Sequence, residues 1–239
     1  MGYKTSEVVL GGGVPKHLIK PLVSRFNIPY FIETGSGGGD SARLAAQYFK
    51  EVYTIELRGE RQNIDKENEN IFWYQGYSHE NLLKIIYKLR NGNAIPKNEM
   101  PYAVFYLDAH YDGDKPIDSK DKDCYLIDEL NIIGSEYGEN AIYIIDDARL
   151  FLGHPPAPND PRQWPTIQEI FRKFDEFYEY HIVTLRDDYI IAYPDRVQDV
   201  FNEEWRSKFH LRYPDEKRVV KNAARTTFAN IKKYLESND

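Results

Sequence analysis

The sequence predicts an α/β fold, with a doubly wound, mostly parallel sheet of seven strands and an antiparallel last strand. Apolar runs rich in β-branched and aromatic residues alternate with segments of helical periodicity, which is the pattern of a parallel sheet with helices on both faces. Several of these runs are apolar almost throughout, as expected for strands that are covered on both sides. Only three polar residues separate the last two runs, and this hairpin spacing predicts that the last strand enters antiparallel.

The expected elements follow one another along the chain. The strand-like runs cover residues 28–33, 51–57, 71–75, 102–109, 140–148, 180–185 and 188–194. Helical periodicity is found over residues 40–50, 78–90, 123–137 and 166–179. Asp40 and Ser78 are residue types that suit the N-cap of the helices that follow them.

No repeat and no shift in composition divides the chain, so we expect a single domain over residues 1–239. Within it, residues 1–27 are expected to form a leading helical segment, residues 28–194 the core, and residues 195–239 a helical tail. The proline-rich stretch 153–165 is typical of an exposed loop after the fifth strand.

The composition excludes several classes of protein. With 41% hydrophobic residues the chain can bury a substantial core, which disfavours intrinsic disorder. A formal net charge of -7 argues against a nucleic-acid partner, because such proteins present a basic surface. The single cysteine excludes an intramolecular disulfide and a cysteine-based zinc site. No signal-peptide pattern and no apolar run of membrane-spanning length occur, so we expect a cytoplasmic protein without a membrane partner.

The stretch FIETGSGGGDSA, residues 31–42, joins the first strand to the next helix through a glycine-rich loop. Glycines let backbone N–H groups approach a ligand, and a helix that begins directly afterwards offers unpaired donors. The loop lacks the Gly-Lys-Ser/Thr of a phosphate-binding ATPase loop, and its glycine spacing is shorter than that of a dinucleotide fingerprint. On these residues alone, two interpretations stay open: a nucleotide-binding loop and a glycine-rich turn that binds no ligand.

Two acids at strand ends narrow the choice of ligand. Glu56 ends the second strand about twenty residues after the glycines, where a carboxylate binds both hydroxyl groups of a free ribose. Glu33 ends the first strand, and a carboxylate there suits a ligand with an ammonium group better than a pyrophosphate. The two acids together indicate an adenosyl ligand that carries an amino acid end.

Acidic residues also end the fourth and fifth strands. Asp108 and His110 follow the fourth strand, and Asp146 and Asp147 follow the fifth. Since ligands of open α/β sheets bind beside these strand ends, we expect the four side chains to meet in one crevice. Our hypothesis is that Asp108, Asp146 and Asp147 bind Mg²⁺ or another divalent cation. His110 is then the base that takes a proton from the substrate hydroxyl.

Two alternatives to the metal hypothesis stay open. Asp108 could contact only the cofactor or cap a helix. Asp147 could pair with Arg149, which follows it by two positions.

The chain resembles the class I S-adenosylmethionine-dependent methyltransferases in five segments that occur in order: FIETGSGGGDSA, VYTIEL, YLDAHYDGD, IIDDARLF and WPTIQEI. More narrowly, it resembles a bacterial-type group with FIETG, LDAHY and IDDARLF signatures. The resemblance runs from about residue 14 to residue 194 and so covers most of the chain. It implies a Rossmann-like methyltransferase fold over residues 28–194 and S-adenosylmethionine as the cofactor.

The resemblance also implies which residues contact the cofactor. The glycine loop is expected to pack against the methionine part and Glu56 to hold the ribose. Ser78 is expected near the adenine, although Tyr77 stands where the family usually has an acid. The implied cofactor contacts are Glu33, Thr34, Gly35, Gly37, Ser41, Glu56, Ser78 and Asp108.

These observations predict an S-adenosylmethionine-dependent methyltransferase that modifies an oxygen of a small molecule, a sugar or a glycan precursor. Its catalytic residues are expected to be His110 and Asp108, with metal assistance if the acidic group binds a cation. One alternative is a nicotinamide-dependent oxidoreductase on a similar sheet, which would bind NAD. Another is a non-catalytic binding module that kept the fold. The sequence names no acceptor and leaves the oligomeric state open, a homodimer included.

Overall fold

A computed structural model of the 239-residue chain describes residues 13–58, 68–111, 121–203 and 206. Of the described residues, 13–198 belong to one compact unit, and residues 199–203, which are helical, belong to a second. The first twelve residues of the expected leading segment and most of the expected tail lie outside the described residues. That residues 1–239 form a single domain therefore stays a prediction.

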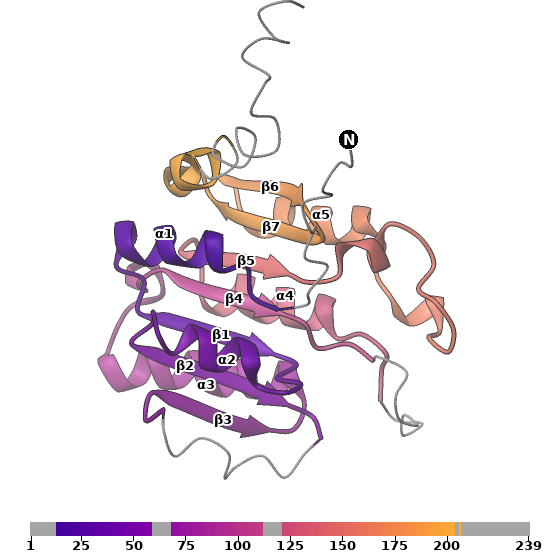
Figure 1. The fold of residues 1–239 in the computed structure, drawn as a ribbon, viewed down its shortest axis with the longest axis horizontal. Helices are drawn as coiled ribbons and strands as arrows, with labels where there is room; N and C mark the ends of the chain where they lie inside the picture. The colour runs from indigo at the N-terminus through magenta and orange to yellow at the C-terminus, as the bar shows by residue number, and fades with distance from the viewer. Residues whose placement is uncertain (1–12, 59–67, 112–120, 204–205, 207–239) are drawn as a thin grey trace, which may run out of the picture. The chain divides into compact units, whose positions relative to one another are not determined.

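The sheet has the predicted architecture. Its strands are β1 (Tyr30–Thr34), β2 (Glu51–Glu56), β3 (Ile71–Gln75), β4 (Ala103–Leu107), β5 (Ala141–Ile145), β6 (His181–Arg186) and β7 (Tyr189–Pro194). Their order in space is β3-β2-β1-β4-β5-β7-β6, as Figure 1 shows. β7 pairs antiparallel with both β5 and β6, and the other pairs are parallel. The prediction of a mostly parallel sheet with an antiparallel last strand is confirmed.

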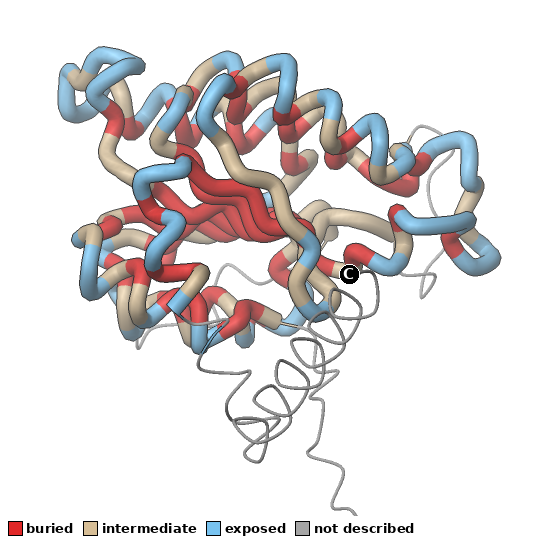
Figure 2. The backbone as a smooth tube through the Cα atoms, turned by 90° about the horizontal axis from the view of Figure 1, so that it is seen from above, coloured by how far each residue is buried: buried red, intermediate tan, exposed pale blue. Residues whose placement is uncertain are grey.

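Helices cover both faces of the sheet (Figures 1 and 2). They are α1 (Lys16–Phe26), α2 (Asp40–Ala45), α3 (Ser78–Asn93), α4 (Leu126–Glu136) and α5 (Ile167–Phe177). Short 3-10 turns are η2 (Lys97–Glu99), η3 (Ala148–Phe151), η4 (Pro161–Gln163) and η5 (Asp195–Val197). Apolar residues of α3, α4 and α5 share one buried cluster with one face of the strands. This packing leaves the carboxyl ends of the parallel strands free to carry a site. Among the described residues, no helix is both long and apolar enough to cross a membrane.

The expected N-caps are wrong by one position. Gly39 and Tyr77 cap α2 and α3, while Asp40 and Ser78 are the first helical residues and neither N-cap makes a side-chain cap hydrogen bond. Gly39 takes the N-cap because the glycine loop enters α2 with a left-handed backbone, at φ 79°. The Asp40 carboxylate instead accepts from the Arg43 guanidinium at 2.7 Å.

Two elements beside the predicted crevice are shorter than the sequence predicts, as is α2, which covers Asp40–Ala45 where residues 40–50 are expected. The strand expected to run to residue 148 ends at Ile145, because Asp147 has a φ of 55° and starts η3. The helix expected from residue 123 begins at Leu126, since Cys124 forms an isolated antiparallel bridge with His110. Apolar periodicity cannot separate a last strand residue from the turn that follows it. Both differences fall beside the predicted crevice.

α5 begins with a complete capping box. The Thr166 hydroxyl accepts from the amide of Glu169, and the Glu169 carboxylate accepts from the amide of Thr166. This arrangement satisfies two of the orphan amides of the first turn and fixes where the helix starts. The proline-rich loop is thereby given a defined end.

Candidate active site

The glycine loop lies at the point where the strand order reverses. β1 is flanked by β2 on one side and by β4 on the other, and ligands of doubly wound sheets bind beside such a switch point. Gly35, Gly37 and Gly39 all have positive φ, at 81°, 46° and 79°. The loop is tied to the neighbouring strand because the Gly35 amide donates to the Ile55 carbonyl at 2.9 Å. The predicted loop therefore sits at the predicted place.

The glycines of this loop are needed for different reasons. A Cβ at Gly35 would lie 2.6 Å from the Asp108 carbonyl carbon and 2.9 Å from the Ala109 amide nitrogen. Nothing lies within 4 Å of a Cβ at Gly37. Gly35 is thus required by the close approach of the loop to the end of β4, while the loop is open at Gly37. The loop therefore leaves space for a ligand at Gly37.

Glu56 is held at the end of β2 by two backbone amides. Its Oε2 accepts from the Gly37 amide at 3.1 Å, and its Oε1 accepts from the Arg58 amide at 3.1 Å. Each carboxylate oxygen has a second lone pair, so the group can still accept two ligand hydroxyls. The role of Glu56 toward a ribose stays a prediction.

Glu33 is a buried carboxyl group, only 1% exposed. It accepts from the Thr54 hydroxyl, which in turn shares a hydrogen bond with Ser36 at 2.6 Å. Burial raises the pKa of Glu33 to about 8, and hydrogen bonds from Thr54 and Ser41 oppose that rise. At neutral pH the group is therefore mostly protonated, and a ligand ammonium beside it would favour the anion.

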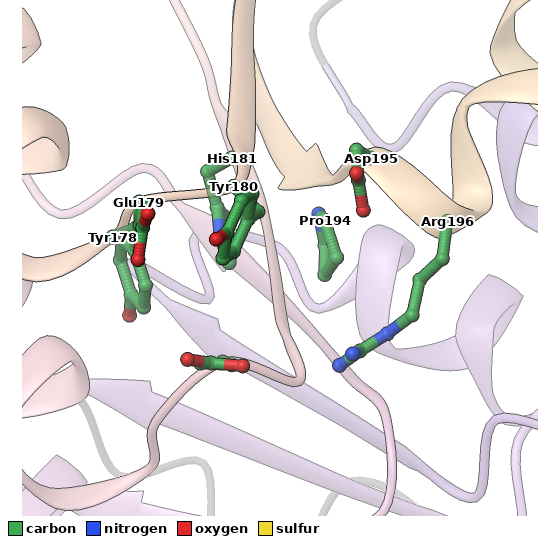
Figure 3. A pocket seen from close by; sticks show the side chains of 8 residues that line it. Tyr178, Glu179, Tyr180, His181, Pro194, Asp195 and Arg196 are labelled. Atoms are coloured by element: carbon green, nitrogen blue, oxygen red, sulfur yellow. The ribbon is translucent and has the colours of Figure 1, made fainter.

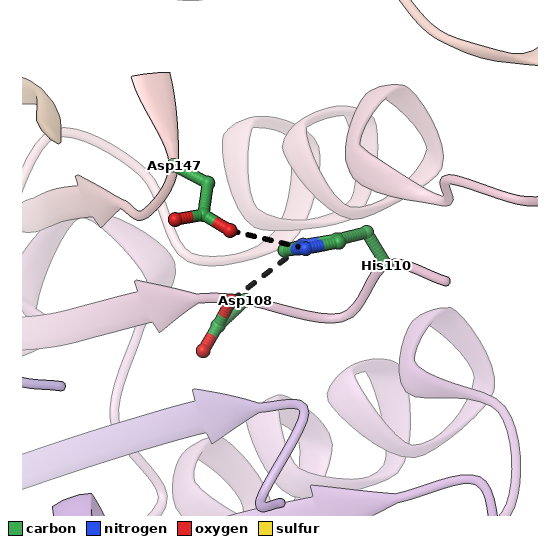
Figure 4. A group of neighbouring side chains, drawn as sticks. All are labelled: Asp108, His110 and Asp147. Carbon is green, nitrogen blue, oxygen red and sulfur yellow. Dashed lines mark ion pairs between the residues drawn. The ribbon is translucent and has the colours of Figure 1, made fainter. Parts of the chain in front are cut away.

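The structure brings Asp108, His110 and Asp147 together (Figure 4). The His110 Nδ1 lies 3.5 Å from Asp108 Oδ1, and its Nε2 lies 3.2 Å from Asp147 Oδ2. The imidazole is only 13% exposed. Both carboxylates approach one ring, so they fix its orientation and stabilise its protonated form.

The three groups shift one another's pKa. Burial, the largest influence, lowers the pKa of His110, but the Asp147 hydrogen bond and the charge of Asp108 outweigh it and the net pKa is raised. Burial raises the pKa of Asp108 to about 8, although the charge of His110 opposes this. The hydrogen bond from His110 lowers the pKa of Asp147, and Arg149 adds to that effect. The arrangement suits a group that exchanges a proton near neutral pH.

Asp146 does not join this group. Its Oδ1 accepts from the Asp147 amide at 2.7 Å and its Oδ2 accepts from the Tyr106 hydroxyl. The three ligand atoms that come within 4.8 Å of one another belong to Asp108, His110 and Asp147, so they differ from the expected trio in one member. Arg149 also donates to Asp147 at 2.6 Å, which is the pairing that the sequence left open.

Two further predicted residues lie deeper than the crevice. Thr34 and Ser78 are buried, and in the described part of the chain neither hydroxyl makes a hydrogen bond of normal geometry. Both lie beside Glu129 of α4, a fully buried acid whose pKa is raised by burial to about 7. Glu129 is not among the residues predicted from the sequence. The sequence does mark it, because the residue stands on the apolar stripe that contains Leu126 and Leu130.

The proline-rich loop contributes to the wall of the site. Trp164 lies with its ring centroid 5.3 Å from that of His110. The loop is anchored by Asp123, a buried acid whose carboxylate accepts from the Asp160 amide at 2.6 Å and whose amide donates to Gln163 at 2.9 Å. One side of His110 is thereby closed by a fixed aromatic ring.

A separate pocket of about 250 Å³ lies at the other edge of the sheet (Figure 3). Its lining comes from the start of β6 and the end of β7, and includes Tyr178, His181 and Arg196. Because β7 runs antiparallel, its end lies beside the amino ends of the parallel strands. This pocket is thus remote from the predicted crevice and contains none of the predicted site residues.

Comparisons with known proteins return structures only. No protein-family model matches the chain, and no curated protein matches it. The solved structures that it resembles include the MycE methyltransferase from the mycinamycin biosynthetic pathway in complex with Mg and SAH (S-adenosylhomocysteine). Its TM-score is 0.49 at 12% identity, and the alignment covers 74% of this chain and 47% of MycE, so this chain spans about half of that protein.

Human methyltransferase-like protein 13 in complex with SAH has a TM-score of 0.45 at 12% identity, covering 74% of this chain and 77% of that protein. At these identities the similarity concerns the fold. The structure itself shows a doubly wound, Rossmann-like sheet of seven strands with an antiparallel β7.

Proposed function

We propose that this protein is an S-adenosylmethionine-dependent methyltransferase that methylates an oxygen of a small molecule, a sugar or a glycan precursor. The observation that carries the proposal is the placement of Glu56. Two backbone amides, one of them from the glycine loop, hold its carboxylate beside the switch point of the sheet. A ribose without a phosphate is the ligand group that such a carboxylate recognises.

The rest of the crevice fits the remainder of this cofactor. The loop is open at Gly37, and Glu33 offers a carboxyl group near the end of β1 where an ammonium group would favour its anion. The hydroxyls of Thr34 and Ser78 and the carboxyl group of Glu129 form a buried polar group beside the crevice. When bound, S-adenosylmethionine supplies a methyl group that is already activated on a sulfonium sulfur.

The residues of the chain supply alignment and a base. His110, between Asp108 and Asp147, accepts the proton of the acceptor hydroxyl at its imidazole. The two carboxylates stabilise the imidazolium that results. Trp164 and the short distance to both acids limit how far the ring can turn. This arrangement favours an acceptor with a hydroxyl group.

The same three residues fit a divalent cation. Asp108, His110 and Asp147 each offer one ligand atom within 4.8 Å of the others, and water can complete the coordination shell. A cation held in this way occupies an imidazole nitrogen of His110. The role of His110 as base and its role as ligand are therefore two versions of the proposal that experiment separates.

Titration calorimetry with S-adenosylmethionine, SAH and NAD tests the cofactor. We expect S-adenosylmethionine and SAH to bind with dissociation constants on the order of 10 µM and NAD to give no heat. Glu56→Gln should weaken SAH binding at least about tenfold, which corresponds to about 1.4 kcal/mol. Absence of binding by both sulfur compounds would overturn the proposal, and tight binding of NAD would favour an oxidoreductase.

Production of SAH from a panel of hydroxyl-bearing acceptors tests the base. His110→Gln should lower the rate about 10²-fold or more while leaving SAH affinity unchanged. Exhaustive chelation separates the two roles of His110: a rate that survives it supports the base, and a rate that returns only with added Mg²⁺ or Mn²⁺ supports the metal. An unchanged rate in His110→Gln contradicts both.

A further inference from the structure

A continuous series of polar contacts lies along one side of the crevice. It starts at the glycine loop, where the Gly37 amide donates to Glu56 at 3.1 Å, and Glu56 also accepts from the Arg58 amide at 3.1 Å. The Arg58 guanidinium lies 3.4 Å from Asp121, and the Tyr77 hydroxyl donates to Asp121 at 2.7 Å. Two carboxylates, those of Glu56 and Asp121, thereby link four separate segments of the chain.

Asp121 joins the two parts of this series of contacts, the part with Glu56 and Arg58 and the part with Tyr77. Its side chain is only 9% exposed, although it lies outside any helix or strand. A carboxylate that is shielded from water needs charged or hydrogen-bonding partners. Both of its partners come from elsewhere: Arg58 follows β2, and Tyr77 is the N-cap of α3. Loss of Asp121 would remove one partner from each of them.

Aromatic contacts hold the segment of Asp121 in place. Tyr125 stacks on the His79 ring with centroids 4.8 Å apart and an angle of 20° between the planes. The Tyr77 and Tyr125 rings are 5.8 Å apart. The segment is thus packed on the first turn of α3, on the side of the crevice where Ser78 predicts the adenine.

We propose that Asp121 is a positioning residue of the cofactor site, which holds Arg58 and Tyr77 so that Glu56 and the start of α3 enclose the adenosine. The inference rests on the proposed function. Asp121 itself need not touch the cofactor. It acts through Arg58, whose amide fixes one oxygen of Glu56, and through Tyr77, which stands where the family resemblance predicts an acid.

The consequence is a slow release of the adenosyl ligand. With Arg58 held, both oxygens of Glu56 keep their amide donors and point their free lone pairs in a fixed direction. When Arg58 is not held, the Glu56 carboxylate must be ordered each time that a ligand binds, which costs conformational entropy. Because most affinity differences between related complexes appear in dissociation rates, we expect the effect in the rate at which SAH leaves.

The experiment measures SAH dissociation by stopped-flow displacement on the full chain. Asp121→Ala should raise the dissociation rate about tenfold with a change of less than about twofold in the association rate. Asp121→Asn keeps an acceptor for Tyr77 but loses the charge that faces Arg58. Its SAH dissociation rate should therefore lie between that of the unchanged protein and that of Asp121→Ala. Asp128→Ala is the matched control, because this acid pairs with Lys122 at 2.7 Å and is 37% exposed. Its dissociation rate should equal that of the unchanged protein.

A double-mutant cycle separates positioning from a general structural role. In a Glu56→Gln background, Asp121→Ala should change the dissociation rate by less than about twofold, because the group that it positions is altered. An undiminished effect in that background, or equal rates for Asp121→Ala and Asp128→Ala, overturns the inference while leaving the proposed function intact. No SAH binding by the unchanged protein refutes the proposed function, and this inference with it.

Discussion

Replacing Gly35 with alanine is expected to destabilise the protein by about 4 kcal/mol, whereas the same change at Gly37 should cost about 1 kcal/mol. Both glycines have positive φ, so both variants carry the strain of a side chain in the left-handed region. Only at Gly35 does the new methyl group also meet other atoms, 2.6 Å from the Asp108 carbonyl carbon. The neighbour is backbone at the end of β4 and cannot rotate away.

Urea denaturation of the two variants measures this difference, and calorimetry with SAH measures its effect on the site. The clash pushes the glycine loop away from β4, so Gly35→Ala should also lose SAH binding. Gly37→Ala should retain binding with a weaker affinity, because the amide that holds Glu56 stays in the chain. Equal destabilisation by the two substitutions would show that close packing of the loop on β4 does not determine its stability.

The sequence predicts the sheet well because its information there is local. Seven apolar runs, the hairpin before β7 and the acids at the strand ends are all visible in short windows. The meeting of Asp108, His110 and Asp147 follows from the same rule, since adjacent parallel strands end at one edge. What short windows do not contain is the direction of each side chain: the Asp146 carboxylate accepts from the Tyr106 hydroxyl and from the Asp147 amide.

Residues that act through distant partners escape sequence reasoning for a physical reason. Asp121 gains its importance from Tyr77 and Arg58, and nothing in the spacing of these residues marks them as neighbours. Gly35 is predicted to contact the cofactor, and short windows do not show that the backbone of Asp108 also excludes a side chain there. Glu129 is different, because an acid on the apolar stripe of a helix is visible in the pattern and predicts a buried polar site.

The unfolding free energy is expected to fall by about 3 kcal/mol as the pH rises from about 6.5 to about 8.5. Burial raises the pKa of Glu33 to about 8 and that of Asp108 to about 8. In the unfolded chain these groups titrate near 4, so above pH 6.5 the folded state binds more protons. Their contribution is complete below the unfolded pKa and is lost as the pH passes the folded one. Glu129, with a pKa raised to about 7, adds to the fall at its lower end.

The pH range of the measurement matters because His181 changes the stability in the direction opposite to the buried acids. Burial lowers the pKa of His181 to about 4, so this histidine makes the protein more stable as the pH rises from about 4 to about 6.5. Above that range its contribution is constant, and the slope is determined by the buried acids together with His110, whose raised pKa acts in the same direction. Urea denaturation at closely spaced pH values is therefore most informative on the alkaline side of neutrality.

Glu33→Gln isolates one of these contributions. The amide oxygen can still accept from the Thr54 hydroxyl, but the group no longer titrates, so the fall in unfolding free energy should be smaller by about 1 to 2 kcal/mol. Glu176→Gln is the matched control, because this exposed acid pairs only with Lys173 among the described residues. Its curve should run parallel to that of the unchanged protein. If Glu33→Gln also runs parallel, Glu33 is ionised in the folded state and its carboxylate is ready to meet a cationic ligand at neutral pH.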